Sequence, residues 1–385
     1  MKRSSVLATG GVVVALALIG GGAAYGKGLN GSPSATVTMC ADKHDGEISL
    51  AGERGCGRGE SEIQLATAAG LNALTARVTS LESSVATLQT QVATLQSQNS
   101  ALQVLLAGVS RPSPTTILFK GVNLQLVDGL GSTTTQNGTG NLIIGYDEGA
   151  TTTTGSHYLV LGTGNSYSSW AAIVAGSGNV AGAPFASIFA GDSNTASGNE
   201  SVVLGGQHNT ASGPASSVSG GGNNTASGHQ SSVSGGAGNT AAGGASAVGG
   251  GGGNSASGLQ SSIMGGSSNT ASGGGSIVGG GFLNTAFGPN SAVLGGGGNH
   301  ANGDTSSVSG GTGNLASGDR SSILGGFTNE ANGVESTIAG GAFNFSAVQA
   351  LVGGGEYNAA NGSRSVVVGG SHQTASSPTS VVLGN

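Results

Sequence analysis

The chain has 385 residues, of which 78 are Gly, while only 7% are charged and 4% aromatic. This composition excludes an ordinary globular core of this size, and the low charge excludes a self-repelling disordered chain. Residues 121–385 carry ten acidic and only two basic side chains, which argues against a nucleic-acid partner. Frequent small residues at a regular period indicate a repetitive fold instead.

Residues 1–26 have the pattern of an export signal. Two basic residues precede an apolar stretch from Val6 to Leu18, and Ala24 and Gly26 fit the −3 and −1 positions of a cleavage site. The alternative is an uncleaved N-terminal membrane anchor, because the apolar stretch could reach about 20 residues. Under both interpretations we expect the rest of the chain to be extracellular or at the cell surface.

Residues 27–60 are predicted to form a linker that contains both cysteines, Cys40 and Cys56. In an oxidising compartment we expect a disulfide between them. It would close a loop of roughly 15 residues and contribute about 3 kcal/mol by the chain-entropy model. A metal centre is disfavoured, because His44 is the only imidazole nearby and zinc prefers four ligands.

Residues 61–108 are predicted to form a coiled-coil stalk, because two apolar series with a seven-residue period run through them without a slip. Valine at a and leucine at d favour a two-stranded coiled coil, and an Asn at an a position sets the register of such dimers. The repeats described below favour a three-stranded one. The a positions are Leu71, Val78, Val85, Val92, Asn99 and Leu106, and the d positions are Leu74, Leu81, Leu88, Leu95 and Leu102.

Residues 109–141 are predicted to be a joint. Pro112 and Pro114 stop the helix and stiffen the chain. The segment from Thr115 to Val127 has the pattern of a β segment, which could cap the open end of the repeats that follow.

Residues 142–385 repeat the pattern S-S-V-S-G-G-x-x-N-T-A-S-G-x-x. Each copy of the pattern has one apolar position, the V, and one residue is deleted before Val352. An Asn lies six residues after the apolar position. The apolar position is occupied by Ile173, Ile188, Val203, Val218, Val233, Val248, Ile263, Val278, Val293, Val308, Ile323, Ile338, Val352, Val367 and Val382. The regular Asn positions include Asn194, Asn209, Asn224, Asn239, Asn254, Asn269, Asn284, Asn299, Asn314 and Asn329.

One such unit is too short to fold alone, and stacking in register solves the problem because each coil covers the next. S-S-V-S and N-T-A-S are strand-length segments that can point Val or Ile and Ala inward and Ser and Thr outward. The Gly pairs supply sharp corners, and stacked Asn side chains can bond along the axis. The fold class is therefore mainly β: a parallel solenoid, about 75 Å long, preceded by an α-helical coiled coil.

Two resemblances add to this prediction. Segments such as SVVLGGQHNTASG and SSILGGFTNEANG resemble the left-handed parallel β-roll heads of trimeric autotransporter adhesins of the YadA-like type. The resemblance implies a trimeric head and an adhesive role, although here the stalk precedes the head. A short module of secreted actinobacterial repeat proteins resembles this chain at Cys40, Lys43, Gly46, Ile48, Cys56, Gly59 and Glu60.

The residue after each apolar position is expected to face outward, beginning with Val174. An uncharged row of large apolar side chains is unusual for a wet face, so we expect it to line a three-fold contact between heads. Scattered exposed apolar residues are the alternative. The large members of the row are Phe189, Leu204, Met264, Leu294 and Leu324.

We expect no enzymatic activity and no cofactor, because no catalytic set or metal-ligand spacing is recognisable among the dispersed His and acidic residues. The predicted function is an exported structural or adhesive surface fibre, a homotrimer or a homodimer, that binds an unidentified surface, matrix or glycan ligand through many equivalent contacts. The alternative is ice binding, since Thr210, Thr225, Thr240 and Thr270 form a hydroxyl file that resembles insect antifreeze solenoids.

Overall fold

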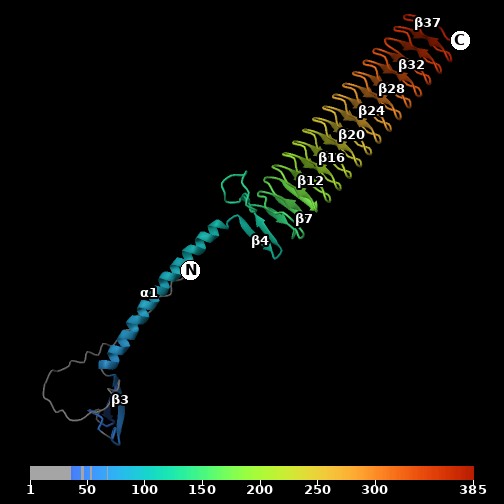
Figure 1. Ribbon diagram of the computed structural model, residues 1–385. Coiled ribbons are helices and arrows are strands. Elements are labelled where there is room, and N and C mark those ends of the chain that lie inside the picture. The colour runs from blue at the N-terminus through green and yellow to red at the C-terminus, as the bar shows by residue number, and fades with distance from the viewer. Residues whose placement is uncertain (1–35, 45–46, 53, 67) are drawn as a thin grey trace. The chain divides into compact units, whose positions relative to one another are not determined.

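The computed structural model describes residues 36–385 except 45, 46, 53 and 67 (Figure 1). The predicted export signal over residues 1–26 lies outside the described residues. The chain divides into two compact units, 1–123 and 124–385, and each is described by itself.

The first unit contains a three-stranded antiparallel sheet of β1 (Thr36–Asp42), β2 (Ile48–Leu50) and β3 (Glu60–Ala66), in the order β2-β1-β3. The prediction that the stalk helix begins at residue 61 is wrong at that end. Residues 60–66 instead pair along the whole of β1, from Asp42 with Glu60 to Thr36 with Ala66. The alternation of polar and apolar residues in this segment suits a strand that has a partner.

A single helix follows, α1 (Ala68–Leu105), and it contains no Pro and no other breaker after Gly70. The predicted a and d side chains are all exposed in the single chain, with Leu81 and Leu95 each 62% exposed. Leu106 falls one residue beyond the helix. That the helix pairs with other copies to form a coiled coil stays a prediction.

After the helix, β4 (Val109–Ser113) and β5 (Thr116–Phe119) form an antiparallel hairpin. The predicted β segment from Thr115 to Val127 therefore ends at Phe119. Gly121 has a φ of +70°, which turns the chain away from the extended conformation.

The second unit confirms the predicted parallel solenoid, with about 16 turns of roughly 15 residues (Figure 1). Two parallel sheets run along it. The alanine sheet has 15 strands: β8 (Ser166–Tyr167), β10 (Val180–Ala181), β12 (Thr195–Ala196), β14 (Thr210–Ala211), β16 (Thr225–Ala226), β18 (Thr240–Ala241), β20 (Ser255–Ala256), β22 (Thr270–Ala271), β24 (Thr285–Ala286), β26 (His300–Ala301), β28 (Leu315–Ala316), β30 (Glu330–Ala331), β32 (Phe345–Ser346), β34 (Ala359–Ala360) and β36 (Thr374–Ala375).

The valine sheet begins with two starting strands, β6 (Leu142–Ile144) and β7 (Leu159–Thr163). Its other strands alternate along the chain with the strands of the alanine sheet, and they pair in chain order. They are β9 (Ile173–Ser177), β11 (Ser187–Ile188), β13 (Val202–Val203), β15 (Ser217–Val218), β17 (Ser232–Val233), β19 (Ala247–Val248), β21 (Ser262–Ile263), β23 (Ile277–Val278), β25 (Ala292–Val293), β27 (Ser307–Val308), β29 (Ser322–Ile323), β31 (Thr337–Ile338), β33 (Leu351–Val352), β35 (Val366–Val367) and β37 (Val381–Val382).

The core between the sheets is one Val or Ile per coil against one Ala. Val293 and Ala301, for example, are both fully buried. The repeat's first Ser, expected to point outward, is also buried, as at Ser291 and Ser306. It precedes the inward Val or Ile by two residues, and side chains two apart on a strand share a face.

The first coils are shorter than the sequence pattern indicates. The inward residue of β9 is Val174, which is fully buried and pairs with Ile188, whereas Ile173 is only half-buried. Val174 in turn pairs with Val160, so each of these first steps is one residue shorter than the regular repeat. The assignment of Ile173 to the core and of Val174 to the outward row is therefore wrong, because a one-residue register shift exchanges the faces of a strand.

The Asn side chains form one continuous hydrogen-bonded column along a corner of the solenoid. The Nδ2 group of Asn299 donates to the carbonyl oxygens of Gly295 and Gly311, each at 2.9 Å. Its Oδ1 accepts the backbone N–H of Asn314 at 3.0 Å, and its own N–H donates to Oδ1 of Asn284 at 3.0 Å. Each Asn therefore ties three successive coils together while leaving none of its amide groups unsatisfied.

Glycine recurs at two corner positions of the coils for different reasons. Gly311 has a φ of +82°, in the left-handed region that side chains disfavour. At Gly318 the reason is space, because a Cβ would overlap the carbonyl group of Gly333 in the next coil. These two positions let adjacent coils approach at strand-pairing distance.

The Asn column yields a test of what holds the coils together. Asn299→Asp places a carboxylate oxygen against two carbonyl oxygens inside the solenoid, so we expect it to destabilise the fold by about 3 kcal/mol at pH 7. Asn302→Asp, three residues away on an exposed side chain, makes the same charge change and should be nearly neutral. Thermal or denaturant unfolding measures both, and equal effects would contradict the structural role of the column.

Candidate functional site

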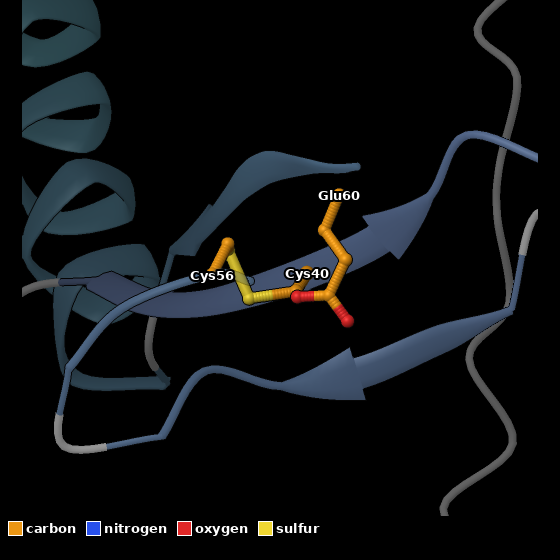
Figure 2. Close-up of side chains that lie close together, drawn as sticks. All are labelled: Cys40, Cys56 and Glu60. Atoms are coloured by element: carbon orange, nitrogen blue, oxygen red, sulfur yellow. A yellow bond between two sulfur atoms is a disulfide. The ribbon is translucent and has the colours of Figure 1, made fainter. Parts of the chain in front are cut away.

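Cys40, Cys56 and Glu60 gather at the small sheet, with one potential ligand atom from each lying within 4.8 Å of the others (Figure 2). The two sulfur atoms are joined in a disulfide, so neither is a thiolate that could bind a metal. The Glu60 carboxylate accepts the Gly57 N–H at 2.6 Å. This cluster therefore ties β1 to the loop before β3, and its chemistry does not fit a metal centre.

A second cluster lies where the loop before β6 covers the first coils. The Asp128 carboxylate, 1% exposed, accepts hydrogen bonds from the Thr135 hydroxyl at 2.7 Å and the Leu130 N–H at 2.9 Å. These two donors, the Thr135 hydroxyl first, lower the pKa of Asp128. The His157 ring lies beside it, with Nε2 accepting the Asp128 N–H at 3.3 Å and lying 3.7 Å from Oδ1.

This cluster borders a cleft of about 550 Å³ lined by residues 125–129, 131–133 and His157. Nearby, the rings of Tyr158 and Tyr167 pack at a tilt with centroids 5.1 Å apart. Tyr167 takes the place of the core Ala, since it pairs with Ala181, and Tyr158 takes the place of the buried Ser two residues before the core Val160. Burial raises the pKa of Tyr158 to about 12. The arrangement closes the first coils with aromatic and hydrogen-bonded groups, which fits a structural cap.

The threonine file lies on the outer face of the alanine sheet. Strand pairing brings Thr195, Thr210, Thr225 and Thr240 into direct register, and Ser255, Thr270 and Thr285 continue the line. Adjacent side chains therefore recur at about the strand spacing of 4.8 Å. The file ends where His300 pairs with Thr285.

The outward apolar row lies on the valine sheet, and its large members are exposed. Met264 is 70% exposed and Leu294 is 59% exposed, with Phe189, Leu204 and Leu324 at similar values. Within the one chain these side chains do not form a continuous surface, because Ser or Gly occupies many of the coils between them. That the row lines a three-fold contact between heads stays a prediction.

The sequence interpretation missed a column of aromatic rings on a corner of the C-terminal coils. Phe327 meets Phe343 edge to face at 5.3 Å, Phe343 stacks on Tyr357 at 4.8 Å, and Tyr357 stacks on His372 at 5.0 Å between ring centroids. Successive members recur at close to the period of the repeat, and this spacing is the sequence signal of the column.

The predicted residues therefore fall into separate places. The core residues and Asn residues lie inside the solenoid, the threonine file and the outward row lie on its two sheets, and the stalk seam lies on α1. Among the described residues, no helix has the length and apolar character needed to cross a membrane.

The comparisons with known proteins add no relative. No protein-family model matches the chain, and no curated protein matches it.

The cap yields a test at Asp128. In the wild-type chain the two carboxylate oxygens of Asp128 accept hydrogen bonds from Thr135 and Leu130, and Asp128→Asn leaves only one carbonyl oxygen to accept them. The loop should then open more often, so we expect thermolysin to cleave residues 124–141 several-fold faster at pH 7. Glu148→Gln, which changes the same charge on an exposed side chain, should leave the rate unchanged.

The cap should also respond to pH in one direction. The pKa of Asp128 is lowered in the folded chain. The ionised carboxylate therefore stabilises the cap at every pH above the ordinary pKa of a carboxyl group, and this stabilisation is lost only as the pH falls through the lowered pKa. Cleavage that accelerates between pH 7 and pH 5 would contradict this role.

Proposed function

We propose that the protein is an exported, non-enzymatic surface fibre that binds by repetition, assembled from several copies through α1. The observation that carries the proposal is the unbroken register of the solenoid: each exposed position recurs coil after coil along the same line. A ligand with its own repeat could engage many such positions at once, so that weak individual contacts add up to firm attachment.

The composition of the solenoid surface supports this class. From residue 201 to 303 the chain has no Asp, Glu, Lys or Arg, and its outward positions are mostly Ser, Thr and Gly. Such a surface suits contact with neutral, hydrogen-bonding material such as glycans better than with nucleic acid. The YadA-like resemblance of the repeats points to the same adhesive role.

The helix supports assembly from several copies. Its 38 residues carry an a/d seam whose Leu and Val side chains are roughly half exposed on the single chain. A row of apolar side chains at a period of 3.5 residues is stabilised when it meets the same row on another copy. Two or three strands satisfy the seam, and the three-fold resemblance of the repeats favours three.

Assembly through the helix can be tested with charges on the seam. Leu81→Glu combined with Leu95→Glu places two carboxylates at d positions, and we expect the full chain to become monomeric in sedimentation equilibrium. The control is Ser83→Glu with Ser97→Glu on the outer helix face, which should keep the wild-type mass. A monomeric wild-type chain would refute assembly, and a dimer would refute the three-fold arrangement.

A second candidate function is ice binding, which the threonine file favours. Seven successive coils present a β-branched hydroxyl residue or Ser in register on a flat, uncharged sheet, and Thr has few χ1 rotamers to lose on contact. An ordered array of methyl and hydroxyl groups at fixed spacing suits an ordered layer of water molecules.

The ice candidate is tested by thermal hysteresis of the full chain. Thr210→Tyr, Thr225→Tyr and Thr240→Tyr together should abolish the activity by interrupting the file. Ser217→Tyr, Ser232→Tyr and Ser262→Tyr, on the outer face of the valine sheet, should preserve it. Absence of hysteresis in the wild-type protein at high concentration would exclude this function.

A further inference from the structure

We propose that the solenoids of neighbouring copies contact each other laterally in their C-terminal coils, with the aromatic corner of one copy seated against the opposite corner of the next. The aromatic corner is defined by Phe327, Phe343, Glu356, Tyr357 and His372. The opposite corner is defined by Val334, Val348 and Arg364. The inference rests on the proposed assembly through α1, which would bring the copies together.

The aromatic corner is an exposed apolar surface with no cover in the single chain. Phe327 is 48% exposed, and Phe343 and Tyr357 are exposed to a similar degree. Their rings contact one another in turn along the solenoid axis, so they form one continuous line rather than scattered contacts. A contiguous exposed aromatic line of this kind marks an interaction surface.

The opposite corner carries a matching set of side chains. Val334 and Val348 are 39% and 46% exposed, respectively, and Arg364 is also exposed. Of the two basic residues in the solenoid, Arg320 is paired with Glu335 at 2.6 Å. Neither Arg364 nor Glu356 has a side-chain partner in the described part of the chain, so each is left to pair elsewhere.

The two corners match coil by coil. Phe327 and Val334 follow Ile323 in one coil, Phe343 and Val348 follow Ile338 in the next, and Glu356 and Arg364 follow Val352 in the third. Copies held parallel and level would therefore place aromatic rings against Val side chains twice. One coil further on they would place the Glu356 carboxylate against the Arg364 guanidinium.

The contact joins two different surfaces, so it is heterologous, and it closes into a ring when the rotation between copies divides a full turn evenly. We place three copies in that ring. Three copies satisfy both corners of every solenoid. The same geometry keeps the first coils apart, because the coil of Ile188 carries acidic residues at both corners, Asp192 and Glu200. The contact is therefore confined to the coils that follow Ile323, Ile338 and Val352.

Cysteine cross-linking of the full chain tests the contact. Ala342→Cys and Val348→Cys lie on opposite corners of one coil, so a disulfide between them forms only across copies. Under mild oxidation we expect the doubly substituted chain to give covalent dimers and trimers, and each single substitution to give neither. Adding Glu356→Arg should cut the cross-linked yield about tenfold, and adding Arg364→Glu to that variant should restore it. Glu200→Arg is the control for a charge reversal outside the contact.

Sedimentation equilibrium and circular dichroism on the same samples separate the outcomes. A folded oligomer that does not cross-link would overturn the lateral contact while leaving assembly through α1 intact. Cross-linking by one single substitution would show a two-fold contact between like corners and would also overturn the proposal. A monomeric chain would overturn both the contact and the proposed assembly.

Discussion

The solenoid depends on the hydrogen bonds that each Asn side chain makes with the coils before and after its own. An Asn amide has two donors and an acceptor, and at Asn224 these are satisfied by Gly220, Gly236 and the backbone of Asn239. The thin core of one Val or Ile against one Ala offers little apolar area per coil. Backbone pairing together with the Asn column therefore fixes the stacking that the core alone would leave loosely specified.

This constraint explains the surface as well as the interior. Once coils stack at a fixed spacing, every outward position becomes a line along the rod, and a single residue type repeated in each coil becomes an extended surface. The threonine file and the aromatic corner arise in this way. Coils contact only their neighbours, so surface residues can vary from coil to coil without disturbing the fold. That independence allows an uncharged stretch and an aromatic stretch to lie on one continuous rod.

The period of the repeat made the fold predictable, because the regular recurrence of Val or Ile and of Asn admits few other structures. The exceptions have local causes. The inward residue of the shorter first coils could not be predicted, because Ile173 and Val174 are both apolar. Only the pairing with Ile188 decides which of the two faces inward. The predicted helix begins too early at residue 61, because residues 60–66 form a strand only by pairing with β1, which precedes them in the sequence. The aromatic corner depends on stacking between side chains, which no single coil shows. The cap contact between Asp128 and His157 joins residues 29 apart with no repeat to indicate it.

The most direct measurement of the central claim is backbone amide exchange across the solenoid. The account predicts that Asn amides in the middle coils, such as Asn239 and Asn254, whose N–H groups bond to the preceding Asn side chain, are the slowest to exchange and recur once per coil. Protection should fall toward both ends of the stack, because terminal coils have a neighbour on one side only. Asn amides that exchange as fast as exposed corner amides, or protection with no period, would contradict a solenoid held together by the Asn column.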